Sequence, residues 1–457
     1  MAGSPTSALA QFAATLRFGD LPADVVETIK LMILDSLGCA IAATTLGDGC
    51  RETIAVMSEL GGRPESSIIG TGRKVSAPSA AFANGALVHA LNYDPIGAEI
   101  GHVGVVCLAA PLAMAEAIGG LTGAEFITAS VVACEISARM TAAIARTGRR
   151  PSEKFLSGQL LSYFGAAAGA GRVLGFDAAQ MRSALGLALM QMSGSRQVVL
   201  SGDPPAKAIY GAFPNQGGVL AALLAKQGLA ADCDIVGEPA GLYPMIYGGE
   251  YDVGTLTDGL GEKFLLNEVD FKPWPTSNHV HAFIEAAAAI PRLDASAIAV
   301  VDIVAHGMLR PWCEPLDKRR RPDHAAAAAN SIPFSVAKSL VHGSVTLQDF
   351  TPHGLRDAVA LAIAEHTTCR FDDAAKGAIV RVRTTDGRLH QANVETPLGH
   401  KSRPVPRKKL IEKFRDCCGH AAQSMTARSV NNLMAMLDDL AGLDDIRRIV
   451  TSLTPEA

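Results

Sequence analysis

The sequence predicts a mainly α-helical protein, with a large all-helical domain built from both chain ends and a smaller α/β domain inserted near the C-terminal third. Three observations predict this class. A chain of 457 residues exceeds the size of one simple core. Hydrophobic residues make up 48% of it and charged residues only 19%, which favours extensive internal packing. The residue pattern is helical over 1–268, mixed over 269–402 and helical again over 403–457.

The helices of the first region are predicted from apolar residues at helical spacing. In residues 22–43, Val25, Ile29, Ile33 and Leu37 fall on one face, and Pro22 is well placed to start the helix. Alanine and glycine are abundant in this region, so the helices can approach one another closely. Further helical stretches of the same kind are 80–92, 124–146, 164–176, 178–194 and 217–229.

The second region combines strands and helices. Residues 297–307 alternate and are rich in β-branched side chains, which predicts a strand. Residues 377–396 form two alternating runs joined through Asp386 and Gly387, the pattern of a β-hairpin. Residues 332–343 and 355–366 are helical in pattern. The stretches 404–425 and 429–440 return to helix, so we expect this tail to rejoin the first domain.

Composition excludes several classes of function. The net charge of −4 gives no basic footprint for nucleic acid. Nine cysteines, an odd number without a CxxC pair, are typical of buried thiols in a reducing cytoplasm. The N-terminus lacks the pattern of a signal peptide. The most apolar stretch, 103–119, contains Pro111 and Glu116 and is short for a bilayer, so we expect a cytoplasmic protein without membrane contact.

Cofactor motifs are also missing from the sequence. It has no Walker loop, HExxH or GxSxG motif, and the glycines of 164–176 follow no strand and precede no suitably placed acid. No lysine on a predicted strand suggests pyridoxal phosphate. We therefore predict neither an organic cofactor nor a metal.

Three polar clusters remain as candidates for chemistry. In the first, Asp94 before Pro95 also suits an ordinary turn, so this loop is either a capped turn between buried helices or one wall of an active site. In the second, Lys207 precedes an apolar helix, where it suits an anion, although a lone lysine is usually solvated. In the third, His279 and His281 alternate and would share a face of an extended segment, but a metal there lacks a third ligand. The cluster members are His89, Asn92, Asp94, Glu99 and His102; Lys207 and Tyr210; and Lys272, His279 and His281.

The clusters supply many histidines and lysines and few free carboxylates. That balance suits a small polycarboxylate substrate, whose charges the cations hold while a histidine or lysine moves the α-proton.

The chain resembles the MmgE/PrpD family, which contains 2-methylcitrate dehydratases, cis-aconitate decarboxylases and iminodisuccinate epimerases. The similarity runs through the whole chain in order. It rests on residues 21–43 (LPADVVETIKLMILDSLGCAIAA), 84–104 (NGALVHALNYD followed by GHVG), 207–229 (KAIYGAFPNQGG and its helix), 262–287 (with FKPWPTSNHVHAF), 331–343 (SIPFSVAKSLVHG) and 396–414 (TPLGHKSRPVPRKKLIEKF).

The resemblance implies a smaller domain that closes as a lid over a cleft, a homodimer and chemistry without an organic cofactor. By position it implies that His102, Lys207 and His281 are catalytic. Asn92, Asp94, Tyr210, Lys272 and His279 are then substrate-binding residues.

Five positions depart from the family pattern. The departures replace a loop aspartate, a loop threonine, two histidines and a tyrosine. Such replacements remove acids, bases and proton donors. Lys154 and Tyr163 lie near one missing histidine and could compensate for it. The departing positions are Asn92, Ile96, Leu156, Tyr210 and Phe334.

Three functions remain open on this basis. The first is a lyase on a small di- or tricarboxylate, a dehydratase or decarboxylase, in which His281 or Lys207 removes the α-proton and the other stabilises the resulting charge. The second is an isomerase or epimerase of an amino or imino dicarboxylate, which needs a base on each face and no leaving-group acid. The third is a catalytically silent member with a binding role.

Overall fold

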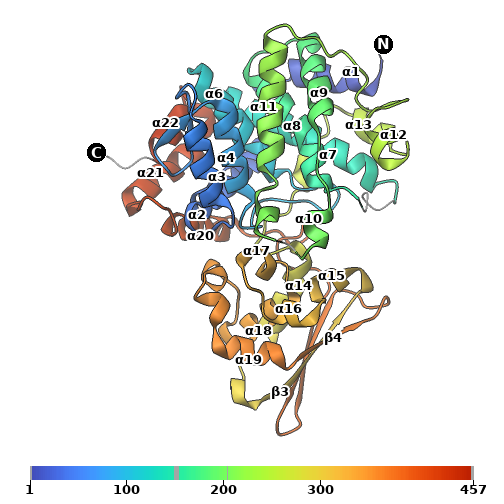
Figure 1. Ribbon diagram of the computed structural model, residues 1–457, viewed down its shortest axis with the longest axis vertical. Helices are drawn as coiled ribbons and strands as arrows, with labels where there is room; N and C mark the ends of the chain where they lie inside the picture. Colours follow the sequence, from blue (N-terminus) through green and yellow to red (C-terminus); the bar gives the residue numbers. More distant parts are fainter. Residues whose placement is uncertain (1–2, 149–153, 203, 454–457) are drawn as a thin grey trace.

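The computed structural model describes residues 3–148, 154–202 and 204–453, and it is mainly helical with small sheets, as predicted. Buried apolar side chains form two separate cores. The larger core belongs to a helical body at the top of Figure 1, and the smaller one to an α/β body below it.

The helical body begins as the sequence predicts. Pro22 caps the start of α2, and Thr122 and Glu125 form a capping box at the start of α7. Its helices are α1 (Pro5–Thr15), α2 (Ala23–Leu46), α3 (Cys50–Leu60), α4 (Ala77–His89), α5 (Gly104–Cys107), α6 (Ala109–Ile118), α7 (Gly123–Ala145), α8 (Ser157–Val173), α9 (Ala178–Gln191), α10 (Gln197–Leu200), α11 (Ala212–Lys226), α12 (Leu242–Tyr247) and α13 (Val253–Thr257).

Small residues bring these helices close together. A Cβ atom at Gly165 of α8 would lie 2.5 Å from the carbonyl oxygen of Ala133 in α7. One at Gly218 of α11 would lie 2.6 Å from the backbone nitrogen of Ala167 in α8. Both positions therefore require glycine, and the predicted close approach of helices is confirmed.

The α/β body contains a four-stranded sheet in the order β4-β3-β5-β6, where β3 and β4 are parallel and the other pairs antiparallel. Gly387, with a φ of 87°, lies in the tight turn of the predicted hairpin. Helices α14, α18 and α19 pack against this sheet. The elements are α14 (Asn278–Ala289), β3 (Ile298–Ala305), α15 (Arg310–Cys313), α16 (Leu316–Arg320), α17 (Ala325–Ala328), α18 (Ile332–His342), α19 (Ala358–Glu365), β4 (Thr367–Phe371), β5 (Ala378–Thr384) and β6 (Leu389–Val394).

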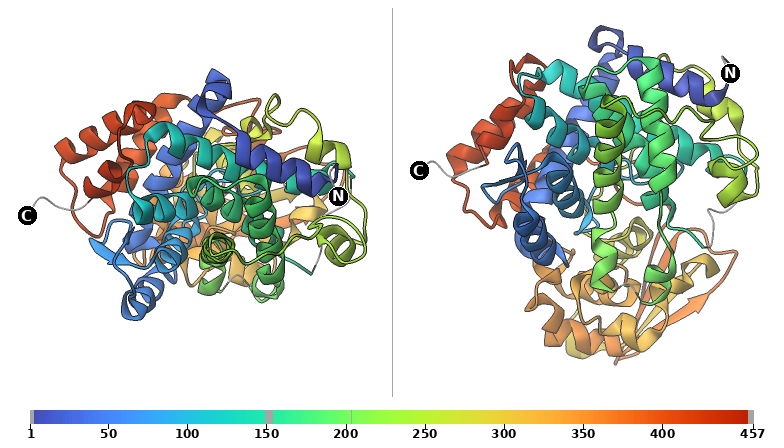
Figure 2. Two further views of the ribbon diagram at one scale, coloured as in Figure 1. Left: turned by 90° about the horizontal axis from the view of Figure 1, so that it is seen from above. Right: turned by 45° about the horizontal axis from the view of Figure 1, so that its top comes forward.

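The C-terminal helices return to the helical body. Phe414, Cys417 and Leu433 belong to its core, and the ring of Phe414 lies against Gly38 of α2. In both views of Figure 2 these red helices flank the blue N-terminal ones. The helices are α20 (Arg407–Gly419), α21 (Ala427–Asp438) and α22 (Arg447–Thr451). Both chain ends therefore build the larger core.

Three of the strands were not predicted. A short hairpin, β1 (Ser66–Ile68) and β2 (Arg73–Val75), interrupts the helical body, and β4 adds an edge strand to the sheet. Helix α7 is long and apolar enough to cross a membrane, but 94% of its apolar window is buried inside the body. It is a core helix of this body.

Candidate active site

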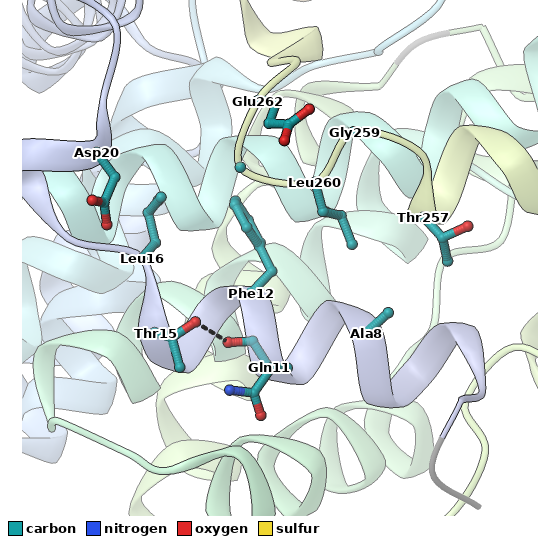
Figure 3. Close-up of a pocket in the computed structure, with 11 residues that line it drawn as sticks. Ala8, Gln11, Phe12, Thr15, Leu16, Asp20, Thr257, Gly259, Leu260 and Glu262 are labelled. Carbon is teal, nitrogen blue, oxygen red and sulfur yellow. Dashed lines mark hydrogen bonds between the residues drawn. The ribbon is translucent and has the colours of Figure 1, made fainter.

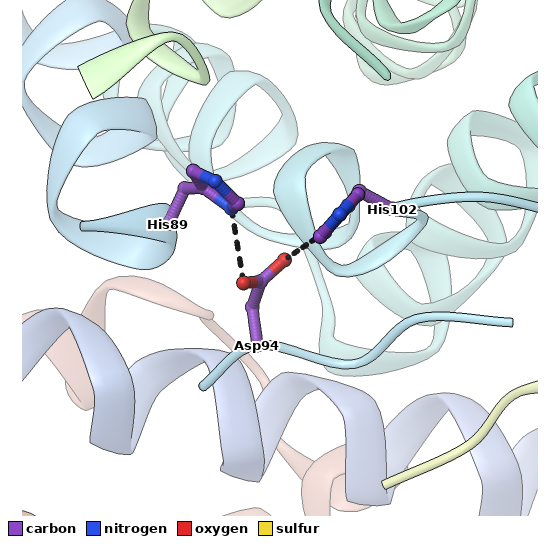
Figure 4. Close-up of side chains that lie close together, drawn as sticks. All are labelled: His89, Asp94 and His102. Atoms are coloured by element: carbon purple, nitrogen blue, oxygen red, sulfur yellow. Dashed lines mark hydrogen bonds and ion pairs between the residues drawn. The ribbon is translucent and has the colours of Figure 1, made fainter. Parts of the chain in front are cut away.

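The candidate site is built around one buried carboxylate. The Nδ1 atom of His89 lies 3.0 Å from Oδ1 of Asp94, and the Nδ1 atom of His102 lies 3.2 Å from Oδ2 of the same side chain. His89 is the last residue of α4, Asp94 follows in the loop, and His102 comes just before α5 (Figure 4). One short loop therefore brings two imidazoles to one acid.

The protonation states of this trio follow from its geometry. Burial alone would raise the pKa of Asp94, but the neighbouring His89 and His102 hold it well below its usual value. Burial lowers the pKa of His102 and lowers that of His89 to about 4, so both rings are neutral at pH 7. An ionised carboxylate only accepts, so each Nδ1 carries the proton and each Nε2 keeps a lone pair.

Tyr210 forms the next wall of the site. Its ring centroid lies 4.0 Å from that of His89 and 6.0 Å from that of His102. A Cβ atom at Gly158, in the first turn of α8, would lie 3.1 Å from the Tyr210 hydroxyl and 3.5 Å from Cδ2 of His102. Burial raises the pKa of Tyr210 well above its usual value, so its hydroxyl remains a donor.

Two lysines supply positive charge. Lys272, which is 1% exposed, donates from Nζ to the carbonyl oxygen of Asn92 at 2.7 Å and to its Oδ1 at 2.8 Å. Burial lowers the pKa of Lys272 to about 8. Asn92 has a φ of 50°, a left-handed conformation that asparagine tolerates.

Lys207 lies on the 3₁₀ turn Pro205–Ile209 before α11, in agreement with its predicted place ahead of an apolar helix. Its side chain is half-buried. Its charge is among the influences that lower the pKa values of His89, His102 and Lys272. The structure thus brings six predicted residues together, namely Asn92, Asp94, His102, Lys207, Tyr210 and Lys272.

The prediction that His279 and His281 share a face of an extended segment is wrong. Both lie in the first turn of α14, where residues two apart point to different sides. His279 packs on Trp312, with ring centroids 4.3 Å apart. Burial, aided by the charges of Lys272 and His102, lowers the pKa of His279 to about 4.

His281 is turned towards Trp274, at 5.4 Å between ring centroids, and is 4% exposed. Its Nε2 has no hydrogen-bond partner in the described part of the chain. Burial is the largest cause that lowers the pKa of His281, and the charge of Lys272 comes next. His102 acts on the pKa of His279 and is not among the groups that act on His281. Its predicted catalytic role stays a prediction.

The departures from the family pattern fall in different surroundings. Ile96 exchanges backbone hydrogen bonds with Asp270, and Leu156 directly precedes α8. Phe334 is fully buried in the smaller core against Phe350, so that change affects packing there. Tyr163 is buried and its hydroxyl lies 3.4 Å from Ser193.

Two other polar residues near the predicted clusters lie at the surface. Lys154 is exposed. Glu99 forms an ion pair with Arg146, and both of these side chains are partly exposed.

Three residues of the arrangement were not among the predicted site residues. His89 belongs to the first polar cluster, and its place five residues before Asp94 was the only available signal. Asp35 of α2 and Lys413 of α20 form a buried ion pair behind the loop, 2.7 Å apart. No feature of the sequence alone marks either of the last two.

His89, Asp94 and His102 also offer three ligand atoms within 4.8 Å of one another, a geometry that could hold a metal ion. Their arrangement fits a hydrogen-bonded trio better. Both Nδ1 protons are directed at the one carboxylate, and the charges of Lys207 and Lys272 oppose a further cation.

A surface cavity of about 650 Å³ lies elsewhere, between α1 and the turn around Gly259 (Figure 3). Its lining includes Gln11, Phe12, Asp20 and Glu262 but none of the predicted site residues.

Known proteins resemble the chain along its whole length. Residues 7–253 match the MmgE/PrpD N-terminal domain, and residues 274–439 match the MmgE/PrpD C-terminal domain. The chain is 25% identical to the cis-aconitate decarboxylase of Aspergillus terreus, over 97% of this chain and 95% of that protein. It is 24% identical to the cis-aconitate decarboxylase of Homo sapiens, over 99% and 95%. It is 25% identical to the 2-methylcitrate dehydratase of Escherichia coli strain K12, over 92% and 91%.

Proposed function

The chain belongs to the MmgE/PrpD family, and we propose that it is a lyase that removes an α-proton from a small di- or tricarboxylate. The observation that carries this proposal is the pairing of His102 with Asp94 beside two lysines. Its relatives named above are decarboxylases and a dehydratase, both of which break a bond next to a carboxylate-bearing carbon.

His102 is the proposed base. Its Nδ1 proton is committed to Asp94, so its Nε2 lone pair is available to take the proton, and its lowered pKa keeps that lone pair free at pH 7. The sequence alone suggested Lys207 or His281 for this role. Lys207 and Lys272 instead hold substrate carboxylates and the negative charge that develops on the carbon.

In both candidate reactions, side chains of the site account for the proton and the leaving group. In a dehydration the C–H electrons form the new double bond, His102 keeps the proton, and hydroxide leaves as water after protonation by Tyr210. In a decarboxylation no α-proton is removed: the C–C electrons return to carbon as CO₂ leaves, and the Lys272 ammonium, which is protonated below a pH of about 8, supplies the proton to that carbon. These steps use side chains of this chain, so we propose chemistry without an organic cofactor.

The test uses cis-aconitate and 2-methylcitrate as first substrates in D₂O, followed by NMR. A new double bond or loss of CO₂ supports the lyase. Deuterium that enters the α-carbon without elimination indicates an epimerase instead. A carboxylate that raises the melting temperature but is never turned over indicates a binding role. Either of the last two results rejects the lyase proposal.

We further propose a homodimer formed through α11. Phe213, Leu220 and Leu224 lie on one face of this helix and are 42%, 38% and 43% exposed. Phe82 extends this apolar face, with its ring centroid 5.3 Å from that of Phe213. Figures 1 and 2 show α11 at the outside of the helical body. A row of apolar side chains on an outer helix suits a self-complementary two-fold interface.

The cytoplasm is the proposed location. All nine cysteines are free thiols, seven of them buried, as expected in a reducing compartment.

A further inference from the structure

Lys413 lies in α20, far along the chain from the site loop, yet its ammonium group lies directly behind that loop. Its side chain is 5% exposed. Its Nζ donates to Oδ2 of Asp35 at 3.0 Å, to the carbonyl oxygen of Tyr93 at 2.8 Å and to that of Lys272 at 3.2 Å. An ammonium group has three protons, so these acceptors use all of its donors.

The two carbonyl groups belong to the two segments that form the site. Tyr93 stands between Asn92 and Asp94, and the Tyr93 ring also lies under the ammonium, 3.6 Å from Nζ to the ring centroid. The ammonium group of Lys272 in turn donates hydrogen bonds to the backbone carbonyl and the side-chain amide oxygen of Asn92. The same three-residue loop is therefore held from one side by Lys413 and from the other by Lys272.

Asp35 completes the arrangement. It is 1% exposed and lies within 2.7 Å of the Lys413 ammonium. Burial works against the charge of Lys413, but the adjacent Asp35 carboxylate raises its pKa above the ordinary value. Lys413 thus remains an ammonium group at any pH at which the enzyme would work. Its hydrogen bonds to both carbonyl groups are therefore not lost through deprotonation.

We propose that Lys413, with Asp35, is a positioning pair that fixes the Asn92–Asp94 loop and the Lys272 backbone in the arrangement that the proposed reaction requires. Neither residue reaches the substrate. Lys413 places Asp94 under His102 through Tyr93, and it places the Lys272 ammonium through the Lys272 backbone. The expected effect on reaction rate rests on the proposed function. The contacts by which Lys413 holds the loop and the Lys272 backbone do not depend on that function.

The Lys272 pKa gives the proposal a second, measurable consequence. Lys272 is faced by Asp94, Asp35, Lys207, Lys413 and the Cys39 thiol, and the charges of Lys413 and Asp35 act on its pKa in opposite directions. Burial is the main cause of its lowered pKa, so a Lys272 ammonium that leaves its fixed, buried place has a higher pKa. Loss of a pair that contributes only to packing would leave the ammonium buried and its pKa unchanged.

The variant that tests this is the double substitution Asp35→Asn with Lys413→Met. It removes both buried charges together, whereas either single change leaves one unpaired and risks unfolding. Lys409→Met is the matched control, because it makes the same change at an exposed position one turn earlier in α20. Circular dichroism and the melting temperature establish that each variant is folded.

The first readout is the titration of Lys272 in the full chain, followed by NMR of ¹⁵N-labelled lysine side chains. The signal is assigned by its loss in Lys272→Arg. We expect the Lys272 pKa to rise above its value of about 8 in the double variant and to stay there in Lys409→Met. An unchanged Lys272 pKa in the folded double variant overturns the proposal. This readout does not need turnover, so it stands even if the wild-type chain proves not to be a lyase.

The second readout is kinetic. On a substrate that the wild type converts, the double variant should lose about tenfold or more in kcat, and the alkaline limb of its pH profile should move to higher pH. If the double variant is folded and keeps the kcat and pH profile of Lys409→Met, Lys413 has no positioning role. Should Asp35→Asn/Lys413→Met not fold, Lys413→Arg is measured instead, because it keeps the ion pair with Asp35 but cannot reproduce the three ammonium contacts. A lower kcat is expected, and a kcat equal to that of the wild type would reject the positioning role.

Discussion

The buried ammonium of Lys272 has the amide oxygen of Asn92, and not a carboxylate, as its side-chain partner, at 2.8 Å. Two carboxylates act on its charge, but Asp94 already accepts from two histidines and Asp35 is paired with Lys413. In the described part of the chain, Lys272 is thus a buried cation without a hydrogen-bonded carboxylate. Burial favours its neutral form and lowers its pKa to about 8, and a substrate carboxylate would supply the missing charge.

The first prediction concerns pH. Because the Lys272 pKa is lowered in the folded state, the ammonium that holds substrate is present below pH of about 8 and is lost as the pH rises through that value. KM should therefore rise on the alkaline side. The sign for stability is opposite: burial of the charged form costs free energy, and this cost is relieved as the pH rises through about 8 towards the unfolded pKa. Steady-state kinetics and urea unfolding at several pH values measure both.

Asn92→Asp should raise the Lys272 pKa, because it places a carboxylate beside the ammonium. The alkaline limb of the pH profile should move up by about one pH unit or more, and KM at pH 7 should rise about tenfold, since the new carboxylate competes with the substrate. Aspartate tolerates the φ of 50°, so backbone strain does not confound the result. An Asn92→Asp enzyme with unchanged KM and pH profile would show that Lys272 does not bind substrate.

Asp94→Asn should lower kcat about 10²- to 10⁴-fold with little change in fold. The amide accepts from one histidine and donates to the other, so one of the two rings must carry its proton on Nε2. In either orientation the neutral amide no longer stabilises the imidazolium that forms when His102 takes the proton. His102→Gln should have a similar effect, whereas Asp317→Asn, an exposed acid in α16, is the control. Single-turnover rates decide the matter. If Asp94→Asn retained wild-type kcat, His102 would not be the base.

Much of the fold could be predicted because its signals are local. Helix α2 follows from the spacing of Val25 to Leu37, and the hairpin of β5 and β6 follows from Asp386 and Gly387. The edge strand β4 was missed because its five residues pair in parallel with β3, more than 60 positions earlier, and no turn marks that pairing.

Spacing along the chain grouped site residues only where they are close in the sequence, and Lys207, Tyr210 and Lys272 were assigned to the same site through the family resemblance. The loop from His89 to His102 gathers three of its members within fourteen residues. The histidines 279 and 281 were misread because the proline-rich segment before them suggests extended backbone, while α14 already begins at Asn278. Lys413 and Asp35 are 378 positions apart, and a single sequence carries no record of which distant residues meet.

Removal of metal should not affect the enzyme. His89, Asp94 and His102 have a possible ligand geometry, but their protons and the nearby lysines favour the hydrogen-bonded form. We expect full activity after prolonged dialysis against EDTA and no gain from added Zn²⁺ or Mn²⁺. Loss of activity that a metal restores would contradict this expectation and would reassign the trio as ligands.

The α11 surface gives the last prediction. Phe213→Ser with Leu224→Ser removes two of the three exposed apolar side chains from the face that we propose as the dimer interface. Each is about 40% exposed in the single chain, so the substitutions should cost the monomer little free energy of unfolding, but they should shift the dimer towards monomer. Light scattering after size-exclusion chromatography measures the mass at several concentrations.

Met190→Ser is the matched control, because Met190 is 80% exposed but lies on α9 and not on this face. The control should keep the mass of the wild type. A wild-type chain that is monomeric at every concentration would reject the dimer. A dimer that survives both substitutions on α11 would place the interface on another surface, since an apolar contact that loses two of its central side chains should weaken by a factor of ten or more.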